Sequence, residues 1–130
     1  MRRAPVITVS RVQIEALQAA MDREFAEKTL AVLMRLWSAR LGVYDPERLI
    51  DWASDGVARA RSLGIVTEQD VAGLLNLSLV LTDFALTFDW PEWARTILSN
   101  TEVGPSHRLE TVLAAWQPRR VEARGTTSDV

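Results

Sequence analysis

The strongest constraint on the fold is a motif that occurs four times along the chain and marks the start of a helix. The first backbone N–H groups of a helix have no partner inside it, and a side-chain oxygen just before the helix accepts a hydrogen bond from one of them. An acid or amide three residues later, or a proline at the first helical position, strengthens the assignment. The four motifs are Ser10 with Gln13, Asp45 with Pro46, Thr67 with Asp70, and Asp89 with Glu92.

The expected helix ends are marked by residues that favour termination. Gly42 and Gly64 are placed to adopt the left-handed conformation that follows many helices. Asn100 is placed to end the fourth helix, Gly104-Pro105 opens a fifth, and Pro118 closes it. The sequence therefore predicts an all-α domain over residues 1–117, without useful strands, and a flexible tail at 118–130. The five helices are expected near 11–41, 46–63, 68–87, 90–99 and 105–117.

The first predicted helix carries an apolar stripe that changes direction. Ile14, Leu17, Met21 and Phe25 follow one another at spacings of three and four residues, which places them on one face of a helix. The next apolar residue of the stripe, Leu30, comes after a step of five residues, so the stripe rotates around the helix. We therefore expect a bend or a change of packing partner between the two halves.

The third predicted helix is apolar on every face. Leucine and valine side chains surround it over residues 71–86, and no Lys or Arg occurs from residue 62 to residue 94. A helix of this kind lies at the centre of a fold or in an interface. We expect it at the centre of the domain, and a homodimer that covers it with a second copy is the alternative.

Composition narrows the possible chemistry. The chain has 130 residues, no cysteine and one histidine, which excludes disulfide frameworks, thiolate zinc sites and multi-histidine metal centres within one chain. A net charge of −2 at pH 7 argues against a nucleic-acid partner. We accordingly expect no metal, no cofactor and no enzymatic activity.

The distribution of apolar residues indicates a cytoplasmic protein. The longest near-apolar run, residues 71–81, is interrupted by Asn76 and Ser78 and is shorter than the roughly 20 residues that a membrane span requires. The N-terminal Met1-Arg2-Arg3 precedes only a brief apolar stretch, without the features of a signal peptide. We therefore expect no contact with a membrane.

Residues 58–75 resemble a helix-turn-helix, because two helical segments flank a short turn at Gly64. A helix that reads DNA presents basic and amide side chains at its start. This one would present Glu68, Gln69 and Asp70, whose carboxylates repel phosphate. The pattern favours an ordinary corner between two helices over DNA binding.

Two further groups of polar residues could carry chemistry, and each has a plainer interpretation. His107 has a side chain suited to a general base, but a catalytic triad needs a positioned nucleophile, and Ser106 is its immediate neighbour. Asp51 and Asp55 share a helix face and could hold a cation. Because Arg59 lies one turn away, a solvated charged face is the simpler interpretation.

The best candidate for a binding surface is a cluster of aromatic and acidic residues between the third and fourth predicted helices. Tryptophan is enriched at interface hot spots because it buries a large area at a small cost in rotamer entropy. Acids around it would complement a basic partner surface. The alternative is that the core absorbs the aromatic side chains. The candidate partner-binding residues are Asp83, Phe88, Asp89, Trp90, Glu92 and Trp93.

Three segments together resemble a known group of proteins. They are Ile7-Thr8-Val9-Ser10 opening a long helix with Phe25, then Gly64-Ile65-Val66-Thr67-Glu68-Gln69-Asp70-Val71-Ala72, and then Trp93-Ala94-Arg95-Thr96-Ile97-Leu98. The pattern resembles small helical proteins encoded in bacterial type VI secretion effector loci, over about residues 7–116. The matching positions are helix caps and core residues, so the resemblance assigns no binding residue.

Such loci contain two kinds of small partner protein. One is an accessory chaperone that helps an effector or its loading adaptor to fold and load, and the other is an immunity protein that neutralises a toxin. The resemblance therefore implies a non-catalytic protein-binding factor, a co-chaperone for a secreted effector or its adaptor. Immunity by direct binding of a cognate toxin is the alternative.

Overall fold

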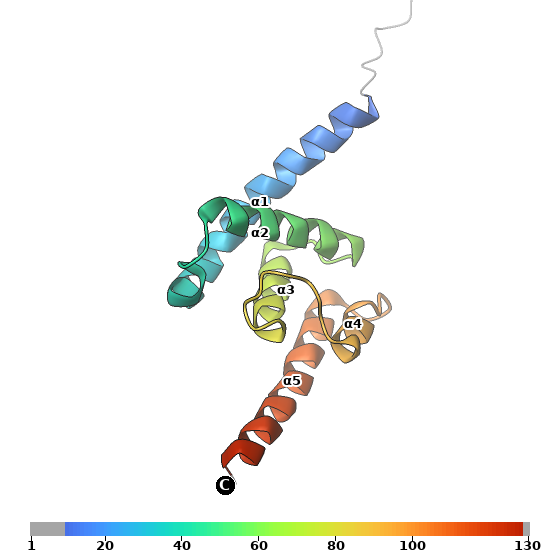
Figure 1. Cartoon of the computed structure of the whole chain (residues 1–130). Coiled ribbons are helices and arrows are strands. Elements are labelled where there is room, and N and C mark those ends of the chain that lie inside the picture. The colour runs from blue at the N-terminus through green and yellow to red at the C-terminus, as the bar shows by residue number, and fades with distance from the viewer. Residues whose placement is uncertain (1–9, 129–130) are drawn as a thin grey trace, which may run out of the picture.

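The computed structural model describes residues 10–128, with side chains described as far as residue 117. Within that range the chain forms five α-helices and no strand (Figure 1). The prediction of an all-α fold with five helices is confirmed. The helices are α1 (Arg11–Leu41), α2 (Pro46–Ser62), α3 (Glu68–Leu81), α4 (Glu92–Leu98) and α5 (Pro105–Ser128).

Three of the four predicted helix starts are confirmed by the hydrogen bonds that the motifs require. In each case a side-chain oxygen accepts a hydrogen bond from a backbone N–H of the first turn. In α2, Pro46 also occupies the first helical position, as predicted. These bonds satisfy donors that the helix itself leaves without partners. They join Ser10 Oγ to Gln13 N (3.2 Å), Asp45 Oδ1 to Glu47 N (2.9 Å) and Thr67 Oγ1 to Asp70 N (3.2 Å).

The fourth predicted start is wrong. Asp89 caps no helix, because α4 begins at Glu92 and the residue before it, Pro91, makes no side-chain capping bond. A proline disfavours the helical conformation of the residue before it, which here is Trp90. The chain therefore stays non-helical up to the proline, and the helix forms only after it.

The left-handed residue expected after α2 is present. Gly64 has a φ of 75°, and the N–H of Ile65 donates to the carbonyl of Ala60 at 2.8 Å. This is a Schellman ending, which satisfies carbonyl groups left open at the end of a helix. The same expectation for Gly42 is wrong, because its φ of −65° is helical.

The third helix ends six residues before its predicted end. α3 stops at Leu81, where the N–H of Phe84 donates to the carbonyl of Leu79 at 2.7 Å. The left-handed position of this second Schellman ending is occupied by Asp83, with a φ of 52°. Glycine is the usual residue there, so the sequence carries no obvious signal that the helix stops.

The fifth helix continues past its predicted end. α5 extends to Ser128, and Figure 1 shows its later part running away from the other helices. The boundary expected at Pro118 is therefore wrong. An internal proline costs a helix about 3 kcal/mol, but good helix formers such as Arg, Glu and Ala dominate residues 119–124. The last two residues of the expected tail, 129–130, lie outside the described range.

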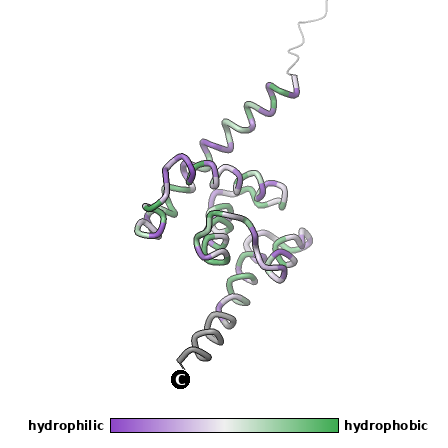
Figure 2. The backbone as a smooth tube through the Cα atoms, viewed as in Figure 1, coloured by the Kyte–Doolittle hydropathy of each residue, from purple (hydrophilic) through white to green (hydrophobic). Residues whose placement is uncertain are grey.

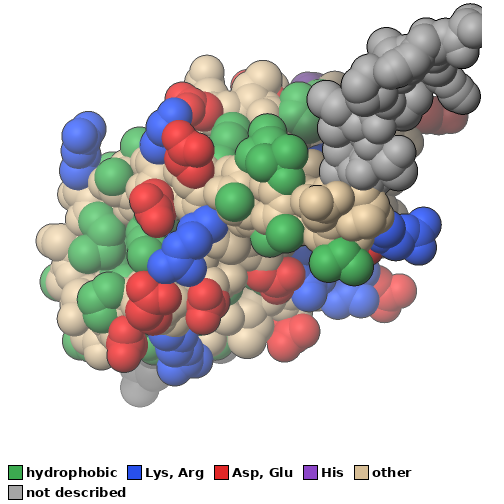
Figure 3. Space-filling view, turned by 90° about the horizontal axis from the view of Figure 1, so that it is seen from above, with side chains coloured by type: hydrophobic (Ala, Val, Ile, Leu, Met, Phe, Trp, Pro, Cys, Tyr) green, Lys and Arg blue, Asp and Glu red, His purple; other side chains and the backbone are tan. Residues whose placement is uncertain are grey.

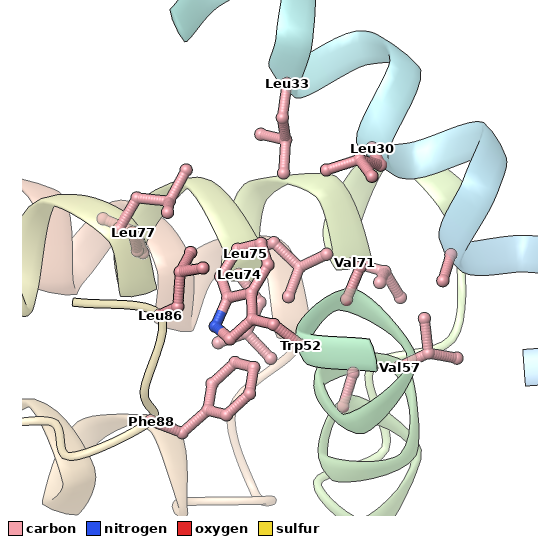
Figure 4. Close-up of a cluster of buried hydrophobic side chains, with 14 of the residues drawn as sticks. Leu30, Leu33, Trp52, Val57, Val71, Leu74, Leu75, Leu77, Leu86 and Phe88 are labelled. Carbon is pink, nitrogen blue, oxygen red and sulfur yellow. The ribbon is translucent and has the colours of Figure 1, made fainter. Parts of the chain in front are cut away.

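The core surrounds α3, which packs against α1, α2 and α5. Its residues Leu74, Leu75 and Leu79 are fully buried. Figure 4 shows Leu30 and Leu33 of α1 directed towards this helix. One chain therefore covers the apolar faces of α3, without the second copy that the sequence left as an alternative.

An ion pair between buried Asp22 and exposed Arg61 joins α1 to α2. Arg61 donates two hydrogen bonds to the carboxylate of Asp22, at 2.6 and 3.0 Å, and Gln18 donates a third at 3.0 Å. The bonds from Arg61 hold the pKa of Asp22 below its ordinary value, although burial opposes them. This pair fixes α1 at the point where it leaves the body of the fold.

Candidate protein-binding surface

The segment between α3 and α4, residues 82–91, is called the corner loop below. Three of its residues that are not glycine have left-handed backbone angles, with φ of 52° at Asp83, 62° at Phe84 and 58° at Leu86. Side chains make this conformation costly, by about 1–3 kcal/mol for each residue. A loop keeps such strain only when its surroundings hold it in place.

The first half of the corner loop is held at Phe84. The hydroxyl of Tyr44 donates to the carbonyl oxygen of Phe84 at 2.6 Å. The ring of Trp37 meets the Phe84 ring edge-on, with centroids 4.9 Å apart. The guanidinium of Arg40 lies over the same ring, 4.0 Å from the centroid. Its Nη2 lies 3.3 Å from Asp83 Oδ1.

The second half of the corner loop is held by two aromatic side chains. Phe88 stacks on Trp52 of α2 with centroids 5.6 Å apart and packs edge-on against Trp90. Figure 4 shows the stacked rings beneath the core leucines. The indole N–H of Trp90 donates to Ser78 Oγ at 2.8 Å, and that hydroxyl donates to the carbonyl of Leu74 at 2.8 Å.

The structure divides the six residues that the sequence placed in one binding patch. Phe88 and Trp90 are each 8 % exposed, so the prediction that they form a surface patch is wrong. Trp93 is half-buried and packs against the core. Side chains alternate in direction along an extended segment, which turns residues 88 and 90 inward and residue 89 outward. The exposed members of the predicted set are Asp83, Asp89 and Glu92.

Two open hollows border the corner loop. The smaller, of about 240 Å³, lies beside Asp83 and Phe84 and reaches Trp37 and Trp116. The larger, of about 470 Å³, is lined by Leu86 and Phe88 of the loop, by Trp52, and by acids and arginines of α2. Its charged lining residues are Arg48, Asp51, Asp55, Arg59 and Asp89.

Opposite charges are mixed over the surface rather than gathered in one cation site. Arg59 Nε lies 3.3 Å from Asp55 Oδ2, as expected for a solvated charged face. Figure 3 shows the same mixing of acidic and basic side chains on the side seen from above. Within the described residues, no three His, Cys, Asp or Glu side chains gather where they could hold a metal ion.

His107 does not meet a nucleophile. Its neighbour Ser106 instead donates its hydroxyl hydrogen to Asp70 Oδ1 at 2.8 Å, which joins the start of α5 to the start of α3. His107 is exposed and lines an open hollow of about 300 Å³. The arrangement gives Ser106 a structural role.

The sequence reasoning missed an exposed apolar face along α1, called the outer ridge below. The expected change of packing between the two halves of the helix is present, because Ala26, Leu30 and Leu33 are buried on a different face. Periodicity places residues on a face but does not show whether that face is covered. Figure 2 shows hydrophobic positions along the part of α1 that extends from the body. The outer ridge consists of Ile14 (55 % exposed), Leu17 (62 %), Met21 (55 %), Val32 (45 %) and Leu36 (63 %), with half-buried Phe25 at its middle.

Two further findings concern possible membrane spans and similarity to known proteins. In the part of the chain that the structure describes, no helix combines the length and the apolar character needed to cross a bilayer. Searches against protein-family models, curated proteins and solved structures find no match for this chain.

Proposed function

We propose that this chain is a non-catalytic protein-binding factor that acts in the cytoplasm. Its expected role is that of a co-chaperone for a type VI secretion effector or its loading adaptor. The observation that carries the proposal is the corner loop. Its backbone is held in three strained conformations by buried aromatic side chains. Asp83 and Asp89 of the loop extend into solvent, as does Glu92 at the start of α4.

A strained loop that is already ordered suits recognition of a partner. Binding costs free energy when loops and side chains must be ordered in the complex, and a surface held in one conformation avoids part of that cost. The inward aromatic side chains provide the rigidity, since Phe88 and Trp90 are fixed by stacking and by the bond to Ser78. The backbone that carries Asp83 and Asp89 is therefore held in one conformation.

The chemistry of the exposed residues favours a basic partner surface. Exposed carboxylates attract Lys and Arg side chains, which raises the rate of association and sets the orientation of the complex. Apolar contact by Phe88 and Trp90 is not part of the mechanism, because both side chains are in the core. The same acids favour immunity as the second candidate function, in which they would cover the basic active site of a toxin.

The test uses the products of the genes that flank this one, purified separately and titrated against the full chain. In the variant, Asp83→Asn, Asp89→Asn and Glu92→Gln are combined. The control combines Glu68→Gln, Glu102→Gln and Glu110→Gln, which are also exposed and lie outside the corner loop. We expect the variant to lose at least about tenfold in affinity and the control to bind normally. Equal binding by variant and wild type would refute the proposal.

The same gene products separate the two candidate functions. A co-chaperone is required for solubility or delivery of the effector, so deletion of its gene lowers both. An immunity protein instead restores growth of a cell that expresses the toxin, without any need for secretion. Growth rescue that is lost in the triple variant would support immunity over the co-chaperone role.

A further inference from the structure

The outer ridge lies on one side of α1 before the kink at Trp37, whose φ of −128° and ψ of 33° are not helical. Lys28 interrupts the apolar side chains between Phe25 and Val32. The ridge residues follow one another at steps of 3, 4, 4, 7 and 4 from Ile14 to Leu36, which keeps them on one side of the helix. At 1.5 Å per residue the ridge is about 33 Å long. An exposed apolar face of this extent marks an interaction surface.

The body of the protein leaves the two ends of this face open. In the middle, Phe25 packs against the core, and Met21 and Phe25 line a hollow with Val57 of α2. Ala26, Leu30 and Leu33 point from α1 towards the core, about a third of a turn away from the ridge at 100° per residue. The first three turns, residues 11–21, have mainly exposed side chains. A helix of that length gains little stability without packing, so contact with another surface would stabilise it.

We infer that the outer ridge pairs with the same ridge of a second copy, in antiparallel orientation about a two-fold axis at Phe25. The spacing supports this occupant, because the two ends of the ridge lie at matching distances from Phe25. Ile14 lies 11 residues before Phe25 and Leu36 lies 11 after it. Leu17 lies 8 before and Val32 lies 7 after. In the antiparallel pair, Ile14 meets Leu36 of the second copy and Leu17 meets Val32 of the second copy.

Charge complementarity supports the same register. Glu24 and Lys28 are exposed and lie along one edge of the ridge, on either side of Phe25. A two-fold axis at Phe25 brings Glu24 of each chain towards Lys28 of the other, which forms two symmetric ion pairs. The antiparallel arrangement also opposes the dipoles of the two helices.

A symmetric dimer supports the part of α1 that extends from the body. Residues 14–21 of each copy lie along residues 29–36 of the other copy, before the kink at Trp37. Each copy contributes the same ridge to the contact, as an interface with two-fold symmetry requires. This inference does not depend on the corner loop or on the identity of its partner.

Sedimentation velocity on the full chain tests the association. We expect a species of twice the 14.6 kDa chain mass at micromolar concentration. Leu17→Glu should convert it to a monomer whose circular dichroism spectrum loses no more helix than residues 11–21 contribute. Val43→Glu is the matched control, because Val43 is 78 % exposed and lies outside the ridge. A wild-type monomer throughout the micromolar range would overturn the inference, and so would a dimer that survives Leu17→Glu.

Crosslinking tests the orientation, since the chain has no cysteine of its own. Ile14→Cys and Leu36→Cys are treated with a short bismaleimide, separately and as an equal mixture. The antiparallel register predicts covalent dimers in the mixture and few in either variant alone. Efficient crosslinking of each variant with itself would mean parallel pairing and would contradict the proposed arrangement.

Discussion

Asp83 occupies a position where glycine would fit the backbone better. It ends α3 with a φ of 52°, whereas Gly64 ends α2 in the equivalent place with a φ of 75°. The two sites share the same Schellman hydrogen bond, from Phe84 to Leu79 and from Ile65 to Ala60. The two helix ends share this hydrogen bond and differ in the residue at the left-handed position, so substitutions at both sites test what the aspartate costs the fold.

We predict that Asp83→Gly stabilises the protein by up to about 1 kcal/mol, since it relieves left-handed strain at an exposed position. Gly64→Ala, by contrast, should destabilise it by about 1 kcal/mol. Urea denaturation of both variants measures the two effects. The aspartate would then be retained for binding rather than stability, so Asp83→Gly should also weaken capture of the partner. A loss of stability in Asp83→Gly would contradict this account.

Trp90 provides a second test at the level of single residues. Its ring is buried and its N–H is bonded to Ser78, so Trp90→Ala should lower the free energy of unfolding by about 3–5 kcal/mol. Glu92→Ala, at an exposed position two residues away, should change it by less than about 0.5 kcal/mol. Unchanged unfolding of Trp90→Ala together with lost binding would show that the ring is a surface contact.

Among the secondary-structure elements, local signals explain which helix boundaries the sequence could predict. The starts of α1, α2 and α3 depend on a side chain and a backbone group within three residues. The capping roles of Ser10, Asp45 and Thr67 could therefore be predicted. The end of α3 could not be predicted because an aspartate takes the place of glycine there. The start of α4 was predicted wrongly because Pro91 overrides the Asp89 motif.

Burial was harder to predict than secondary structure, because it depends on contacts distant in sequence. The inward direction of Phe88 and Trp90 depends on Trp52 and Ser78, which lie on other helices. The outer ridge follows from the position of α2 and α3, which cover only one side of α1. Of the predicted binding residues, the acids could be expected at the surface and the aromatic side chains could not.

Two glycines within helices test the packing of α3 against its neighbours. A Cβ atom at Gly56 would clash with Leu75 Cδ2 and would lie 2.8 Å from Phe88 Cζ, so Gly56→Ala should cost about 1–3 kcal/mol. A Cβ atom at Gly73 would lie 3.2 Å from Leu109 Cδ1. Gly73→Ala should leave stability unchanged or raise it by up to about 1 kcal/mol. Thermal unfolding of the two variants measures these changes in stability. Equal changes for Gly56→Ala and Gly73→Ala would show that helix propensity outweighs packing.

The ion pair between α1 and α2 predicts a pH dependence. The pKa of Asp22 is lowered below its ordinary value of 3.8, so its contribution is complete above that pH and is lost as the pH falls through the folded-state pKa. Asp22→Asn should lower the free energy of unfolding by about 1–2 kcal/mol at pH 7. Denaturation from pH 7 down to the acid range should show the two proteins converging, and a constant difference would contradict the assignment.

At the scale of the whole molecule, two surfaces with different chemistry lie on separate elements. The corner loop presents carboxylates from a rigid backbone between α3 and α4, and the outer ridge presents apolar side chains along α1. A charged contact weakens as salt is added, whereas apolar burial does not. Salt should therefore weaken binding of the partner and leave the dimer intact.

Hydrogen exchange on the complex with the partner tests the central claim most directly, because it reports each backbone segment separately. The account predicts slower exchange across residues 82–92 when the partner is added, at a protein concentration where the ridge is already paired. Residues 11–36 should exchange at the same rate with and without the partner. Protection confined to residues 11–36, with no change in the corner loop, would contradict the claim that the corner loop is the binding surface.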